Sequence, residues 1–152
     1  MSLLEILDKN CIKTDIQSLD KLGSIQELTE LLFKNKKISD KSQVINDVLK
    51  REAKGSTGIG KGIGVPHAKT AAVSKLTLAI GVSREGVDFT SIDGKYVHIL
   101  FLLLAPPHSA GPHVEALSEI ARLITPPGIK EKIKNASSSE EIITIITEYY
   151  NS

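Results

Sequence analysis

The chain has 152 residues, of which 41% are hydrophobic and 4% aromatic, and its formal net charge is +1. A chain of this size and apolarity can bury one core, so we expect residues 1–152 to form a single domain. The 19 basic and 18 acidic residues nearly balance, and few aromatic side chains are available to stack on bases, so no nucleic-acid partner is expected.

The sequence carries no signal for a membrane or an oxidising compartment. Cys11 is the single cysteine and cannot form an internal disulfide, which fits a reducing compartment. The first ten residues have neither a basic start nor a long apolar stretch, so no signal peptide is expected. The longest apolar run, residues 97–105, is too short to span a bilayer as a helix. We therefore expect a cytoplasmic protein without membrane insertion.

Two amphipathic helices are predicted in the first third of the chain. Residues 24–35 place leucines on one face, and Ser24 and Glu27 have the spacing of a capping box. Residues 41–54 follow with a second apolar stripe, and Asp40 is suited to cap that helix. A glycine-rich loop therefore begins where a helix ends.

Three strands are predicted after that loop. They cover residues 76–83, 86–89 and 95–105, with turn signals at residues 84–86 and 93–94 between them. The third is apolar on both faces, as a central strand is.

Two further helices are predicted towards the C-terminus. Residues 112–124 begin with a proline, which suits the first helical position, and place His113 in the first turn. Residues 138–150 begin with Ser138 and Glu141 at capping-box spacing. Helices before and after a run of strands predict an α/β fold, with a single mixed sheet of about five strands flanked by helices on both faces.

The glycine-rich loop, GSTGIGKGIGVPHAK, spans residues 55–69 and raises the question of a bound nucleotide. Residues 55–61 match the first seven positions of a Walker A motif, but the eighth must be Ser or Thr and here is Gly62. A phosphate loop of that kind also runs from a strand into a helix, whereas this loop follows a helix. The alternating glycines do not fit the dinucleotide fingerprint either. A turn with unusual backbone angles is the structural alternative.

The end of the loop favours a different function. Pro66 fixes its own φ and extends the residue before it, so the backbone entering His67 is stiff. Ser56 and Thr57 offer hydroxyl donors, and glycine amides such as that of Gly58 can point at an anion. This combination suits a phosphoryl group carried on His67.

These residues resemble the active-site segment of the enzyme IIA domains of the bacterial phosphoenolpyruvate-dependent phosphotransferase system, of the fructose, mannitol and nitrogen-regulatory type. The resemblance is carried by residues 51–69 and by a second segment, HVEALSEIARL, at residues 113–123, and it extends over essentially the whole chain. Two residues depart from the family pattern, and these departures concern the loop geometry and the preference for partners. Gly64 stands where alanine is more frequent in the family, and His108 is an extra histidine before His113.

The resemblance implies that His67 accepts a phosphoryl group, at Nε2, from the phosphohistidine of the carrier protein HPr. The chain would then be a phosphotransferase component that passes the group to a cysteine of an enzyme IIB domain, with no cofactor and no metal expected. The alternative is a nitrogen-regulatory protein, in which the phosphorylation state controls binding to client proteins. Partner docking is expected on an apolar rim that includes Ile59 and Ile63.

Arg51 and His113 complete the predicted catalytic set with His67. The planar guanidinium of Arg51 can bind two phosphate oxygens, and its charge disfavours an imidazolium at His67. His113, in the positive field of a helix N-terminus, can donate a hydrogen bond to the phosphate. The predicted phosphate-binding residues are Ser56, Thr57 and Gly58.

The remaining candidates have weaker signals. Glu52 either supports Arg51 or has a local role only. His98, within the apolar strand, is expected to be a core or edge histidine, and His108 a surface loop residue. The four histidines and Cys11 do not have the spacing of a zinc site.

Overall fold

The computed structural model describes residues 2–152. Its elements are α1 (Leu3–Ile6), a short 3-10 helix η1 (Lys9–Cys11), β1 (Ile12–Lys13), α2 (Lys21–Lys34), α3 (Lys41–Glu52), β2 (Gly58–Gly60), β3 (Ile63–Gly64), β4 (His67–Lys69), β5 (Thr77–Val87), β6 (Val97–Ala105), α4 (Pro112–Leu123), α5 (Ile129–Lys134) and α6 (Ser139–Tyr150). Among these helices, none is long and apolar enough to cross a membrane.

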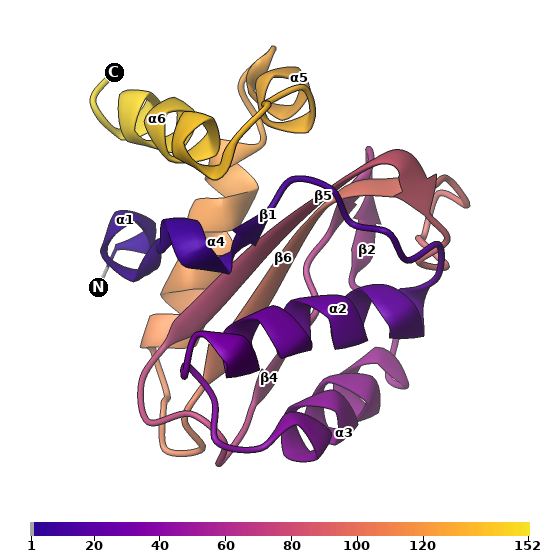
Figure 1. The fold of residues 1–152 in the computed structure, drawn as a ribbon, viewed down its shortest axis with the longest axis vertical. Coiled ribbons are helices and arrows are strands. Elements are labelled where there is room, and N and C mark those ends of the chain that lie inside the picture. Colours follow the sequence, from indigo (N-terminus) through magenta and orange to yellow (C-terminus); the bar gives the residue numbers. More distant parts are fainter. Residues whose placement is uncertain (1) are drawn as a thin grey trace.

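One mixed sheet of six strands forms the centre of the fold (Figure 1). The strand order is β1-β5-β6-β3-β2, and β4 also pairs with β6. The long strands β5 and β6 are antiparallel, whereas β3 and β4 both run parallel to β6 along its other edge. The predicted α/β fold with one mixed sheet is confirmed, with six strands in place of about five.

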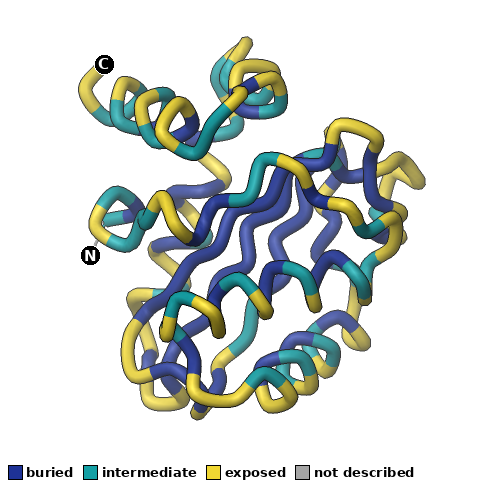
Figure 2. The backbone as a smooth tube through the Cα atoms, viewed as in Figure 1, coloured by how far each residue is buried: buried dark blue, intermediate teal, exposed yellow. Residues whose placement is uncertain are grey.

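Helices cover both faces of the sheet, as predicted. The buried side chains of α2 and α3 pack on one face, and those of α1, α4, α5 and α6 pack on the other. Figure 2 shows the sheet buried between helices whose outer sides are exposed. Both cores meet at β6, whose alternate residues belong to different clusters: Ile99 and Phe101 to one, Leu100 and Leu102 to the other. Each such side chain contributes roughly 1.5–3 kcal/mol by leaving water, which explains the continuous apolar run of this strand.

The start of α2 differs from the prediction. The helix begins at Lys21, and the side chain of Asp20 accepts a hydrogen bond from the Gly23 N–H at 2.7 Å. Ser24 is buried within the helix, and the Glu27 carboxylate accepts from residues of the preceding segment instead of capping. The predicted Ser24–Glu27 capping box is therefore wrong, because Asp20 provides a cap one turn earlier.

The other helix starts agree with the sequence. Asp40 caps α3 by accepting from the Gln43 N–H, and a proline is the first residue of α4. Ser138 caps α6 by accepting from the Glu141 N–H at 3.1 Å. The Glu141 carboxylate accepts from the Ser137 N–H at 2.7 Å, so only half of the predicted box forms.

The predicted turn at residues 84–86 is wrong. Strand β5 continues to Val87, and the pairing register with β6 shifts between Val82 and Val87. Gly86 has a φ of 98°, which a glycine adopts without strain. The turn signal therefore marks a bulge inside one strand, and residues 86–89 do not form a strand of their own.

Candidate active site

Arg51, His67 and His113 line one surface cavity of about 390 Å³. Arg51 lies in the last turn of α3, His67 is the first residue of β4, and His113 lies in the first turn of α4. The structure thus brings together all three residues that the sequence predicts as catalytic.

The sheet topology explains why the two histidines meet. Strand β4 runs parallel to β6, with His67 opposite Leu103. The Pro66 carbonyl accepts a hydrogen bond from the Leu103 N–H at 3.0 Å, so the backbone immediately before His67 is also bound to β6. A short connection, residues 106–111, joins the end of β6 to α4. The first turn of α4 therefore begins near the C-terminal end of β6, which is the part of β6 that pairs with β4.

A backbone carbonyl fixes the tautomer of His67. The Nδ1 atom lies 2.7 Å from the Val65 carbonyl oxygen, and a carbonyl can only accept, so Nδ1 carries the hydrogen. In the neutral ring the lone pair is then on Nε2. His67 is half-buried and lines the cavity, so Nε2 is the nitrogen that can act as a nucleophile.

His113 is held in its neutral form. Burial lowers the pKa of its imidazole below the ordinary value of 6.5, and the charges of Lys69 and His67 lower it further. Its Nδ1 atom is buried and has no hydrogen-bond partner among the described residues. At neutral pH the His113 ring therefore carries no positive charge, and Arg51 is the charged partner for an anion in the cavity.

The pKa shift of His113 predicts a pH-dependent contribution to stability. Because its pKa is lower in the folded state than in the unfolded chain, this contribution is complete above about pH 6.5 and is lost as the pH falls through the lowered pKa. We expect His113→Gln to lose less stability than the parent between about pH 7.5 and about pH 5 in urea unfolding. An unchanged pH dependence in His113→Gln would contradict this role of burial.

Cations surround the cavity. Its lining includes the exposed lysines Lys50, Lys54 and Lys69 in addition to Arg51, against one carboxylate, Asp47. Such a concentration of positive charge raises the local concentration of anions. The sequence reasoning did not name these lysines. The helical spacing of residues 47, 50, 51 and 54 was the signal that could have placed them on one face.

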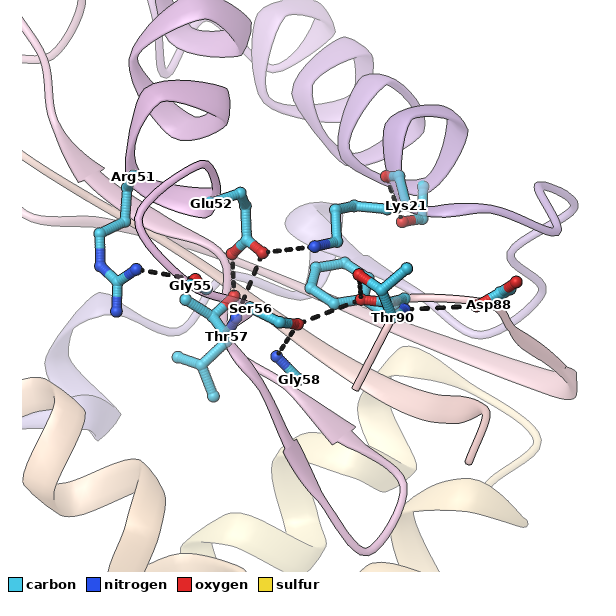
Figure 3. A network of polar contacts seen from close by, with 12 residues as sticks. Lys21, Arg51, Glu52, Gly55, Ser56, Thr57, Gly58, Asp88 and Thr90 are labelled. Carbon is cyan, nitrogen blue, oxygen red and sulfur yellow. Dashed lines mark hydrogen bonds and ion pairs between the residues drawn. The ribbon is translucent and has the colours of Figure 1, made fainter. Parts of the chain in front are cut away.

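Arg51 keeps most of its hydrogen-bonding capacity. Its Nη1 donates to the Gly55 carbonyl at 3.0 Å, which is the single hydrogen bond of the guanidinium to residues 2–152 (Figure 3). A guanidinium has five N–H donors in a planar fork, so the remaining donors can bind phosphate oxygens.

The structure does not bring Ser56, Thr57 and Gly58 into this cavity. Thr57 is buried and donates both its N–H and its hydroxyl to the Glu52 carboxylate. The Ser56 hydroxyl donates to the Phe89 carbonyl and accepts from the Gly58 N–H. All of these donors are used within the protein, so phosphate binding by these three residues stays a prediction that their contacts do not support.

Several secondary predictions can be compared with the structure. His98 is half-buried in β6, which is paired on both sides and is not an edge strand, and its Nδ1 lies 2.8 Å from the Ser83 carbonyl. His108 is an exposed loop residue, as expected. Ile63 is fully buried, so its predicted place in an apolar docking rim is wrong: its strand β3 pairs alongside β6, and its side chain lies in the core. Ile59 is exposed but lines a different cavity. Among residues 2–152, histidine, cysteine and acidic side chains form no group of three that could hold a metal ion.

Known proteins similar to this chain point to one family. Residues 5–149 match the family described as "Phosphoenolpyruvate-dependent sugar phosphotransferase system, EIIA 2". The PTS system fructose-specific EIIA component of Haloferax volcanii is 36% identical over 128 residues, covering 84% of this chain and 83% of that protein. A nitrogen regulatory protein of Klebsiella oxytoca is 32% identical over 150 residues, covering 97% and 91%. The fructose-specific EIIABC component of Bacillus subtilis is 38% identical, and the match covers 98% of this chain but 24% of that protein.

Solved structures agree with these relatives. The nitrogen regulatory protein IIA-Ntr of Neisseria meningitidis has a TM-score of 0.87 at 34% identity, covering 95% of this chain and 98% of that one. The complex of IIA and phosphorylated IIB of the Escherichia coli mannitol system contains a chain with a TM-score of 0.79 at 18% identity, covering 93% and 97%, which shows the fold alone.

The fold and the matched segments thus define a component of the phosphoenolpyruvate-dependent phosphotransferase system. The chain belongs to the EIIA 2 family of that system.

Proposed function

We propose that this chain is a phosphocarrier that accepts a phosphoryl group on His67 Nε2 from phosphorylated HPr. The observation that carries the proposal is the cavity that His67, Arg51 and His113 line together, with the Nδ1 of His67 bound to the Val65 carbonyl and its Nε2 left for chemistry. The Nε2 lone pair attacks phosphorus, the donor's P–N bond breaks, and its electron pair returns to the donor nitrogen. The positive charge that develops on the His67 ring is stabilised by the Nδ1–H bond to the Val65 carbonyl.

The cations of the cavity would stabilise the transferring group. The equatorial oxygens of a phosphoryl group carry its negative charge, and catalysis of the transfer consists mainly of positioning and electrostatic stabilisation. Arg51 supplies the planar fork for two of these oxygens, and Lys54 and Lys69 add positive field at the rim. Neutral His113 can donate a hydrogen bond without adding charge that would hold the group too tightly.

We further propose that the phosphorylated chain passes the group to a cysteine of an enzyme IIB domain. The fructose-specific EIIABC relative, whose name joins the A and B components in one protein, supports this acceptor. The cytoplasmic location expected from the sequence stays a prediction.

A nitrogen-regulatory role is the second candidate. It is favoured by the 32% identity to the Klebsiella oxytoca nitrogen regulatory protein and by the fit to IIA-Ntr. The two candidates separate in one experiment, in which the chain is phosphorylated with phosphoenolpyruvate, enzyme I and HPr and then mixed with a purified IIB domain of the fructose type. Loss of the phosphoryl group to the IIB cysteine is the expected result. A phosphorylated chain that keeps the group in the presence of IIB domains would favour the regulatory role.

A further inference from the structure

An ion pair between buried Glu52 and partly buried Lys21 adjoins the glycine-rich loop. Lys21 Nζ is 2.8 Å from Glu52 Oε1, and the two side chains are 20% and 4% exposed. The same Nζ lies 4.9 Å from the centre of the Phe89 ring. Removing two charges from water costs free energy, and apolar side chains of similar volume would avoid that cost. Stability alone therefore does not account for this pair.

Glu52 closes the loop that follows α3. Its carboxylate accepts from the Thr57 N–H at 3.2 Å and from the Thr57 hydroxyl. The Gly55 N–H donates to the Glu52 carbonyl at 3.1 Å, so Gly55 and Thr57 are both bound to Glu52. The Ser56 hydroxyl adds a bond to the Phe89 carbonyl, which connects the loop to the segment after β5.

The closed loop presents the acceptor that holds Arg51. The Gly55 carbonyl accepts from Arg51 Nη1 at 3.0 Å, and Arg51 is the residue next to Glu52 in α3. Figure 3 shows Glu52 pointing towards Lys21 and Thr57 while Arg51 points towards Gly55. One end of α3 thus carries a buried carboxylate that fixes the loop and a cavity-lining cation that binds to the loop.

We propose that Lys21, Glu52 and Thr57 form a clamp that fixes the Gly55 carbonyl and through it the guanidinium of Arg51. The proposal rests on the proposed function for its kinetic consequence. None of the three residues lines the cavity, so they are positioning residues. An arginine held in place before the phosphoryl group arrives loses less conformational freedom on binding it, and this accelerates transfer.

The clamp can be weakened without leaving a buried charge unpaired. Thr57→Val removes the hydroxyl bond and keeps both the N–H and the ion pair, and Thr57→Ser restores the hydroxyl. Changing Lys21 alone would strand the Glu52 carboxylate in the interior, so the pair is replaced together as Lys21→Met with Glu52→Gln. Lys41→Met is a matched control, because Lys41 also pairs with a carboxylate at 2.8 Å and lies 4.8 Å from a phenylalanine ring, but in an exposed position.

The first arm of the test measures the order of Arg51 without any phosphoryl donor. We expect NMR relaxation of the Arg51 Nε–H group to show greater mobility in Thr57→Val and in the double variant than in the parent. Thr57→Ser and Lys41→Met should match the parent. Unchanged mobility of Arg51 in both clamp variants would overturn the proposal, whether or not the chain accepts a phosphoryl group.

The second arm measures single-turnover transfer from phosphorylated HPr in a double-mutant cycle. We expect Thr57→Val to slow transfer by about tenfold when Arg51 is present, and by less than about twofold in an Arg51→Ala background. An equal loss in both backgrounds would mean that Thr57 does not act through Arg51, and would overturn the clamp. Phosphoryl uptake by the parent reports on the proposed function alone, so the two failures are distinguishable.

Discussion

Replacing His67 with alanine is expected to abolish phosphoryl uptake from phosphorylated HPr. The Val65 carbonyl binds Nδ1 of His67, so the lone pair of the neutral ring is on Nε2. His113 also lines the cavity, but no hydrogen bond within residues 2–152 fixes the tautomer of its ring through Nδ1. The measurement is the intact mass of the chain after incubation with phosphoenolpyruvate, enzyme I and HPr. The parent should gain one phosphoryl group and His67→Ala none.

Two histidine variants control this result. His108→Ala changes an exposed loop residue and should be phosphorylated like the parent. His113→Ala keeps His67 and should still take up phosphate, though more slowly. If His67→Ala gained an acid-labile phosphoryl group at the parental rate, another residue would be the carrier.

Arg51→Ala is expected to slow transfer from phosphorylated HPr by about a hundredfold or more. A preorganised donor aimed at developing negative charge contributes on this scale, and within residues 2–152 Arg51 is the one guanidinium that lines the cavity. Arg51→Lys should recover part of the rate, because an ammonium supplies charge without the planar fork. Rapid-quench measurement of a single turnover gives the rate of the chemical step.

Arg84→Ala provides the matched control. Arg84 also donates to a backbone carbonyl, that of Ala136, at 3.0 Å, and it lines a separate cavity. Its removal should leave the transfer rate close to that of the parent. A parental rate in Arg51→Ala would show that this guanidinium does not stabilise the transferring group.

The main elements of the fold could be predicted because their signals are local. The helices α3 and α4 have a cap or an initial proline within the sequence that forms them, and β6 shows its burial as an unbroken apolar run. His113 could be placed in a helical first turn for the same reason. His67 could be singled out because a proline and a run of glycines precede it.

The features that the sequence did not predict depend on partners far along the chain. Strands β2, β3 and β4 have two or three residues each, and their strand geometry comes from pairing with one another and with β6. The ion pair of buried Glu52 with Lys21 joins the end of α3 to the start of α2, and no spacing rule connects those positions. For the same reason the hydroxyls near residue 57 looked available for phosphate, although Glu52 and the Phe89 carbonyl bind them.

The central claim is that the phosphoryl group is bonded to His67 Nε2. Long-range proton–nitrogen NMR of the phosphorylated chain, labelled with ¹⁵N in histidine, identifies which ring nitrogen is bonded to phosphorus. The account predicts coupling of phosphorus to Nε2 of His67, with a hydrogen retained on Nδ1. A phosphoryl group on Nδ1 of His67, or on any other residue, would contradict it.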